Sequence, residues 1–117
     1  MSLSLHLESA ALEPGAELRG RIDWRAEGAP VESVLLSLLW YTEGKGTEDV
    51  AIVEQVEVES PAIEGRSDFS FRLPDFPWSF SGTLVSLVWA VEASLEPDGA
   101  VERVTLVSAP EAREIVL

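Results

Sequence analysis

The stretch Leu84-Val85-Ser86-Leu87-Val88-Trp89-Ala90-Val91-Glu92-Ala93-Ser94-Leu95 decides the fold. Large apolar residues recur at every second position around Trp89, while Ser86, Glu92 and Ser94 stand on the other parity with two smaller apolar residues. A period of two predicts a β-strand with one buried face. The additional apolar residues on the second face favour a central position in a sheet.

The segments on either side repeat this alternation. Strands are expected at 3–7, 18–24, 31–41, 50–58, 69–73, 101–108 and 115–117. Turn-forming sequences lie at 13–15 and 97–99, and further loops are expected at 44–46 and 61–65. Gly20, inside a strand pattern, marks a bulge or a close approach of two segments. Roughly eight strands and no convincing helix predict an all-β antiparallel sandwich of about seven to nine strands, as one domain over residues 1–117. Its strand order stays open.

Two of these strands carry more specific expectations. Segment 31–41 is apolar on both faces near its middle, which is typical of a central strand. In segment 50–58, Val50, Ile52, Val56 and Val58 fall on one parity and are expected to share one face. The glutamates at 54, 57 and 59 are interpreted as the solvated face of that strand.

Composition and charge narrow the classes of function. The chain has 117 residues, 21 acidic against 8 basic, and a net charge of -13. Such a surface disfavours nucleic acid and anionic membranes, because their binding needs clustered Lys and Arg. Basic proteins and cations are better partners, and solubility alone also explains the charge. No cysteine is present, which excludes disulfides and thiolate chemistry.

Residues 1–8 contain no basic region, and no apolar run approaches the roughly 18 residues of a membrane span. A cytoplasmic protein without membrane insertion is expected.

The order of several short motifs along the chain resembles that of a known family. The segment Phe69-Ser70-Phe71-Arg72-Leu73-Pro74 leads into Pro77-Trp78-Ser79-Phe80-Ser81-Gly82-Thr83 and then into the long strand. Upstream lies Leu12-Glu13-Pro14-Gly15-Ala16-Glu17-Leu18-Arg19-Gly20-Arg21-Ile22. This order resembles the arrestin-like family, over nearly the whole chain. The resemblance implies an immunoglobulin-like or arrestin-like sandwich used as a protein-binding scaffold.

Two departures limit what the resemblance carries over. Arrestins and their relatives usually hold two such sandwiches in tandem, and this sequence shows the pattern once. Receptor-binding arrestins read phosphates with lysines and arginines, whereas Lys45 is the only lysine here. Phosphoreceptor recognition and family site residues are therefore not transferred.

Candidate catalytic chemistry is sparse. His6 is expected to face outward, and no Gly-x-Ser-x-Gly elbow accompanies it. No pair of carboxylates stands out for glycoside hydrolysis, and the acids around Gly44 and Gly46 show no EF-hand spacing. These glycines precede no helix, so a phosphate cradle is not expected either. No catalytic residue, cofactor or metal is predicted.

Tryptophans are the other candidate contact residues. Trp24, Trp40 and Trp89 fall on apolar faces, which favours core packing. Trp78 lies in a proline-rich corner, where it can anchor a partner, and Phe80 follows it. Trp78 and Phe80 are the candidate protein-interaction residues, with capping of the core as the alternative role.

Three hypotheses of function follow. The first is a non-enzymatic scaffold or adaptor that binds a protein partner or a second copy of itself, because the edge strands of a sandwich accept further strands. The alternative is an accessory sandwich that binds a small ligand or a carbohydrate. A hydrolase with a triad built around His6 is the third and least supported.

Overall fold

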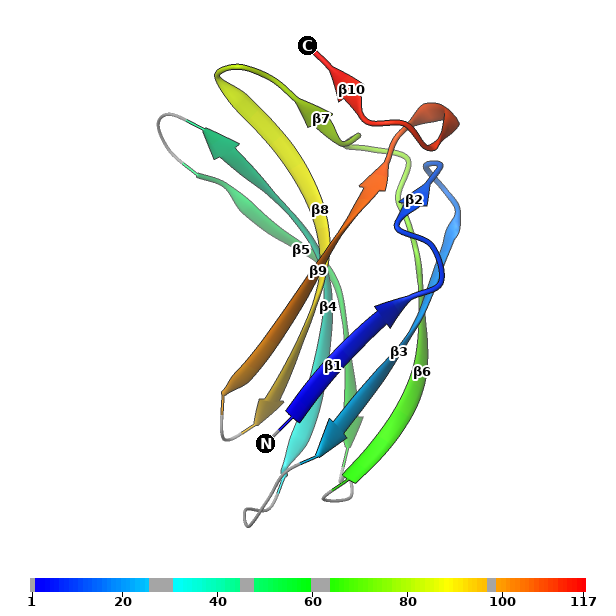
Figure 1. Cartoon of the computed structure of the whole chain (residues 1–117), viewed down its shortest axis with the longest axis vertical. Coiled ribbons are helices and arrows are strands. Elements are labelled where there is room, and N and C mark those ends of the chain that lie inside the picture. The colour runs from blue at the N-terminus through cyan, green and yellow to red at the C-terminus, as the bar shows by residue number, and fades with distance from the viewer. Residues whose placement is uncertain (1, 26–30, 45–47, 60–63, 97–98) are drawn as a thin grey trace.

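A computed structural model describes residues 2–25, 31–44, 48–59, 64–96 and 99–117 (Figure 1). Their long strands are β1 (Ser2–Leu7), β3 (Glu17–Arg25), β4 (Ser33–Gly44), β5 (Val50–Glu59), β6 (Glu64–Arg72), β8 (Val85–Glu96) and β9 (Ala100–Ser108). Three two-residue strands are β2 (Ala11–Leu12), β7 (Phe80–Ser81) and β10 (Ile115–Val116), and a single 3₁₀ turn spans Pro110–Ala112. The expectation of an all-β chain with little helix is confirmed.

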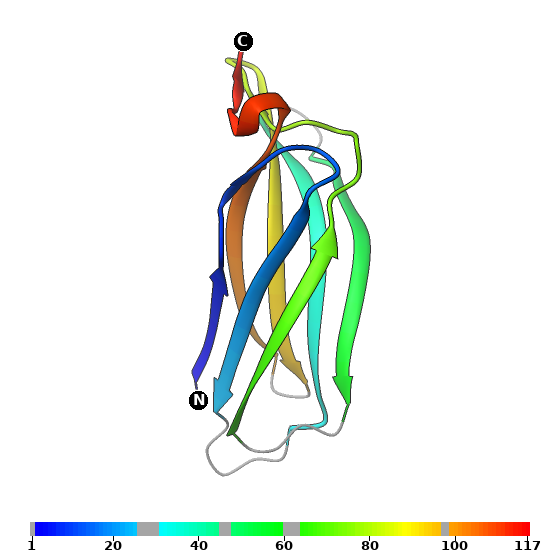
Figure 2. The ribbon, with the colours of Figure 1, turned by 90° about the vertical axis from the view of Figure 1, so that its right-hand side faces the viewer.

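The strands form two sheets that pack face to face (Figure 2). The small sheet has the order β1-β3-β6, and the large sheet runs β10-β7-β8-β4-β5, with β9 on β8 and β2 on β9. All pairings between long strands are antiparallel, whereas the short pairs β2·β9 and β7·β10 are parallel. The predicted β-sandwich is therefore confirmed.

The centre of the large sheet is the pairing of β4 with β8. It runs without interruption from Ser33 opposite Glu96 to Gly44 opposite Val85. Because β5 and β9 flank this pair, both strands have neighbours on each side, as their apolar faces predict. β5 and β6, in contrast, stand at the ends of their sheets.

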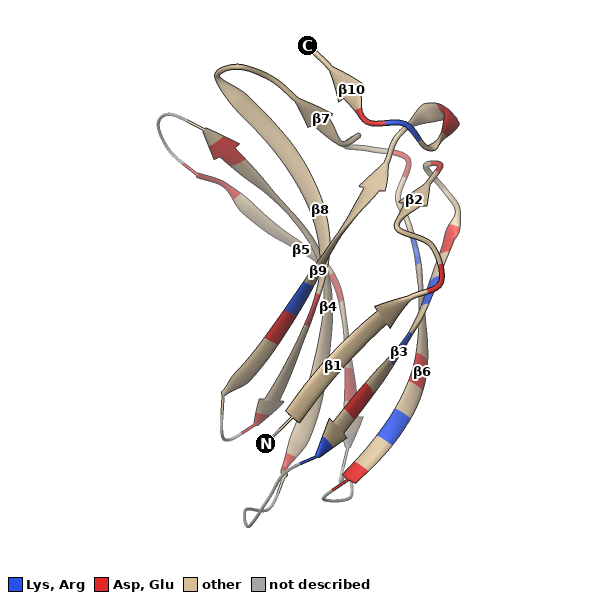
Figure 3. Ribbon diagram, viewed as in Figure 1, with Lys and Arg blue, Asp and Glu red and all other residues tan. Residues whose placement is uncertain are grey.

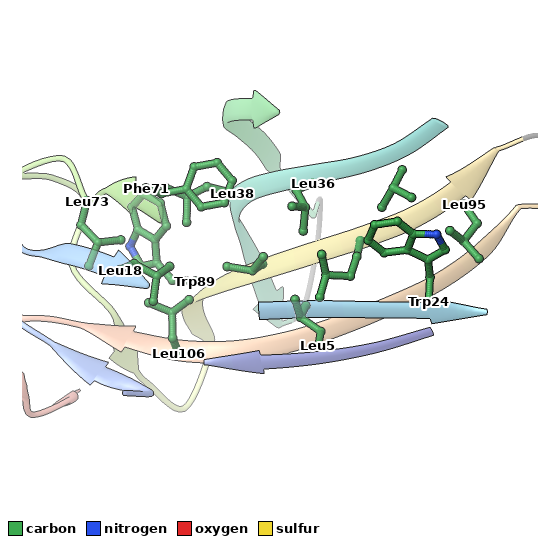
Figure 4. Close-up of a cluster of buried hydrophobic side chains, with 14 of the residues drawn as sticks. Leu5, Leu18, Trp24, Leu36, Leu38, Phe71, Leu73, Trp89, Leu95 and Leu106 are labelled. Carbon is green, nitrogen blue, oxygen red and sulfur yellow. The ribbon is translucent and has the colours of Figure 1, made fainter. Parts of the chain in front are cut away.

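The core lies between the two sheets (Figure 4). Trp89 is completely buried there, and its indole Nε1 donates a hydrogen bond to the Pro77 carbonyl at 2.9 Å. The indole N–H is the polar group of the ring, and without this bond its burial would leave it with no hydrogen-bond partner. The other labelled members of the cluster are Leu5, Leu18, Trp24, Leu36, Leu38, Phe71, Leu73, Leu95 and Leu106.

Two glycines on the inner face of the small sheet make room for aromatic rings. A Cβ on Gly20 would lie 2.5 Å from the Phe69 ring and from the His6 carbonyl oxygen. A Cβ on Gly65 would lie 2.4 Å from the Trp24 ring. The close approach predicted at Gly20 is thus real. The loop predicted at Gly65 is wrong, because this glycine pairs with Trp24 inside β6.

The prediction that four apolar residues of β5 share one face is also wrong. An irregularity lies between Leu38 and Leu39, where Leu38 pairs with Glu54 and Leu39 with Ile52, so that Val53 is an extra residue. Such a bulge breaks the two-residue period. Val56 therefore stays on the inner face, opposite core residue Leu36, while Val50 and Ile52 move to the outer face.

Replacing Gly20 by Ala tests this packing. The new methyl group meets both a ring and a backbone oxygen, so movement of Phe69 alone cannot relieve it. We expect a loss of about 1–3 kcal/mol of unfolding free energy, measured by urea denaturation. Ser70→Ala, on the exposed face of β6, is the matched control and should stay close to the parent protein. Equal stability of both variants would contradict the close contact.

Candidate functional site

The surroundings of His6 do not form a catalytic triad. Its Nε2 lies 3.3 Å from Ser4 Oγ and 4.0 Å from Asp23 Oδ2, so one ring nitrogen faces both neighbours. A working triad needs the serine and the aspartate on opposite ring nitrogens. Asp23 is also hydrogen-bonded by Arg66. Among the described residues, no three His, Asp or Glu side chains gather as metal ligands.

The outer face of the small sheet carries an internally matched set of charges (Figure 3). Rows across β3 and β6 place opposite charges side by side, and these rows are Glu17/Arg72, Arg21/Asp68, Asp23/Arg66 and Arg25/Glu64. Opposite charges on neighbouring strands stabilise their register by about 0.2–1 kcal/mol per pair. The arginines in these rows therefore lie beside carboxylates of the same sheet.

Three shallow hollows open on that same face. They lie beside Asp23 and Arg66, beside Arg19 and Ser70, and beside His6 and Arg21. Their walls combine residues of the charged rows with serines, glycines and Glu8. They offer no enclosed apolar chamber of the kind that holds most small ligands.

The corner that contains Trp78 presents a stacked aromatic pair. The Phe76 and Trp78 rings lie 5.3 Å apart at an angle of 19°, and Trp78 Nε1 donates to the Asp75 carbonyl at 2.7 Å. Trp78 is half-buried, whereas Phe76 is 69% exposed. Phe76 carries no signal of its own in the residue pattern, although it stands two residues before Trp78.

Phe80 occupies a different position from Trp78. It lies in β7, is half-buried and packs against the core, opposite Leu87 of β8. Its contacts suit a plug at the end of the sandwich. The two predicted interaction residues thus lie close in sequence but differ in setting.

The free edge of β5 presents several exposed apolar side chains on one long strand. Within the described residues β5 pairs with β4 alone. Val50 is 63% exposed, Ile52 58% and Val53 43%. Exposed branched residues beside an unpaired backbone are the features that let a sheet accept another strand.

The backbone of this edge is oriented to bind. The Thr42 amide donates to the Asp49 carbonyl at 2.9 Å, so this pair is hydrogen-bonded across β4 and β5. Antiparallel ladders alternate bonded and non-bonded pairs. The N–H and C=O groups of Val50 and Ile52 consequently point away from β4, toward the free side.

The residue pattern identifies β5 as a strand but not as a site. Alternation predicted that Val50, Ile52, Val56 and Val58 share a single face. The bulge that exposes Val50 and Ile52 leaves no signature in the residue pattern. Only the strand order shows that β5 is a terminal strand of its sheet.

Comparison with solved structures supports the fold. The chain is similar to the crystal structure of Spo0M, a sporulation control protein from Bacillus subtilis, with a TM-score of 0.68 and 19% identity. The match covers 92% of this chain and 49% of that one, so the chain spans about half of its neighbour. This neighbour has an arrestin-like fold, and the present chain shares that fold.

Sequence comparisons add no family. No protein-family model and no curated protein match the chain. Among the described residues, no helix is long and apolar enough to cross a membrane.

The charged rows of the small sheet predict a pH effect. The hydrogen bond from Arg66 lowers the pKa of Asp23 and outweighs the opposing effect of desolvation, with Arg21 acting in the same direction as Arg66. Because the pKa of Asp23 is lower in the folded chain than in the unfolded chain, the ion pair stabilises the fold above the unfolded-state pKa. This stabilisation is lost as pH falls through the folded-state pKa. Arg66→Gln should therefore destabilise the chain more at neutral pH than below the ordinary carboxyl pKa of about 4.

Urea denaturation at both pH values measures this difference. Arg113→Gln removes the same charge elsewhere and should show a smaller dependence on pH. Carboxyl-carbon NMR should show the pKa of Asp23 rising in Arg66→Gln alone. An unchanged Asp23 titration would contradict the assigned pairing.

A second prediction separates the two roles of the aromatic corner. If Phe76 is a surface residue, Phe76→Ala should cost only about 0.5–1.5 kcal/mol, the value of an aromatic pair. Phe71→Ala, which truncates a buried ring, should cost about 3–5 kcal/mol. Thermal and urea unfolding provide both numbers. Equal losses would identify the corner as a core cap.

Proposed function

We propose that this chain is a non-enzymatic protein-protein interaction module, a scaffold or adaptor of arrestin-like type. The observation that carries the proposal is the free edge of β5, with exposed Val50, Ile52 and Val53 beside unpaired backbone groups. A partner strand added there would continue the large sheet, since main-chain hydrogen bonds provide affinity and alternate side chains provide specificity. A cytoplasmic location stays a prediction.

The aromatic corner is a second contact region in this proposal. Phe76 and Trp78 offer a large, rigid apolar surface at low entropic cost, as interface anchors do. Phe80 packs against the core and is not part of this exposed surface.

The carbohydrate or small-ligand alternative, suggested by Trp78 and scattered acids, would use the aromatic corner, where Trp78 is half-buried and Phe76 is exposed. The three hollows lie elsewhere, on the small sheet, beside ion pairs such as Arg19–Glu17 and Arg66–Asp23. Geometry therefore favours the protein-binding role. A titration of tryptophan fluorescence with a sugar panel would support the alternative if millimolar ligand shifted the signal.

Site-specific photo-crosslinking tests the proposal. A photoreactive phenylalanine analogue placed at Ile52 should capture a defined protein in native lysate, while the same group at Val101 should not. Val101 is a suitable control because it is similarly exposed, at 55%, but lies on β9. Mass spectrometry identifies the products. The same proteins from both positions, or none from Ile52, would contradict the assignment of β5 as the interface.

A further inference from the structure

The chain around β5 is strongly one-sided in charge. Segment 31–59 contains seven acidic residues and a single basic one, Lys45. The acidic residues are Glu32, Glu43, Glu48, Asp49, Glu54, Glu57 and Glu59. The small sheet differs, because its strands hold five arginines and four acids. Segment 31–59 therefore has a net charge of -6, from one base and seven acids, whereas the strands of the small sheet have +1, from five arginines and four acids (Figure 3).

Three of these acidic residues belong to β5 itself, namely Glu54, Glu57 and Glu59. Glu54 and Glu57 are exposed, and the register places Glu54 opposite Leu38 on the inner face and Glu57 opposite Leu35 on the outer face. The ion pairs found among the described residues involve neither of them. A partner strand beside β5 would therefore meet unmatched negative charge on both of its faces.

The exposed apolar residues of the strand are concentrated at its start. Val50, Ile52 and Val53 precede Glu54, and Val56, which is 39% exposed, lies between Glu54 and Glu57. A complementary strand needs branched apolar residues beside Val50, Ile52 and Val53 and lysine or arginine beside Glu54 and Glu57. Opposite charges across strands are favourable, and like charges placed directly opposite are not.

From this arrangement, and resting on the proposed function, we infer that the edge of β5 binds an extended segment that combines branched apolar residues with lysine or arginine. A second copy of this chain is a poorer occupant, because its own β5 contains no lysine or arginine to pair with Glu54 and Glu57. The partner is therefore a different, basic protein segment.

Peptide binding to the full chain tests the inference. The probe is a fluorescent nine-residue peptide with valines in one half and three lysines in the other, and its control carries glutamates in place of the lysines. In fluorescence anisotropy the lysine peptide should bind at least tenfold more tightly. Its affinity should fall as salt rises, since exposed charges are screened over about 8–10 Å at physiological ionic strength.

Two sets of variants locate the binding. Glu54→Lys with Glu57→Lys should weaken binding of the lysine peptide about tenfold, because each favourable cross-strand pair is replaced by a pair of like charges. Glu102→Lys with Glu114→Lys makes the same change in net charge away from β5 and should retain binding. Equal losses in both sets would overturn the inference, because they would show a long-range charge effect only.

Blocking the backbone provides an independent test. Ile52→Pro removes an N–H that points to the free side and should abolish binding without breaking the β4 ladder. Chemical-shift mapping on the parent protein reports the same contact if that variant does not fold, and should show the peptide at Val50, Ile52 and Glu54. Shifts confined to the small sheet would overturn the inference.

The outcomes separate this inference from the proposed function. One outcome is a partner that is captured through Ile52 and still binds equally well to the Glu54→Lys, Glu57→Lys variant. That result would retain the proposal of an interaction module and overturn the inference that the partner segment is basic. Capture of a second copy at Ile52 has the same consequence. Failure of both capture and peptide binding overturns the two together.

Discussion

The antiparallel pairing of β4 with β8 is the constraint on which the rest of the structure depends. It joins two twelve-residue strands along their whole length, and their inner residues supply much of the core, including Leu36, Leu38, Trp89 and Val91. Burial of these side chains against the small sheet is the main stabilising contribution. β5 attaches to the outer side of β4, and its side chains from Ile52 to Glu57 are all exposed. The central pair of β4 and β8 thus supports β5, an edge strand whose side chains are accessible.

Alternation revealed most of the architecture because buried and solvated residues alternate wherever a strand is regular. It located the long strands and correctly placed Trp24 and Trp89 inside. It failed at two places. Val53 is an extra residue in β5, so the residues before it face the opposite side from the one that alternation predicts. Gly65 resembles a loop residue but belongs to β6, where the absence of a side chain leaves room for the Trp24 ring. The two-residue strands depend on tertiary pairing and leave no local pattern.

Net charge alone described the surface incompletely. A value of -13 is consistent with solubility, a basic partner or both. The fold distinguishes two surfaces within that total. Arginines and acids alternate across β3 and β6, where they fix the register, while the acids near β5 have few cations around them. Identifying which acids were matched required the strand order, which the residue pattern could not provide.

Amide hydrogen exchange, followed by NMR on dilute monomeric protein, tests the central claim most directly. The account predicts that the amides of Val50 and Ile52 exchange rapidly because they point to a free edge, while those of Leu38 and Val91 in the central pair exchange only through global unfolding. Protection of Ile52 equal to that of Leu38 would show that the edge is already paired, and would contradict the account.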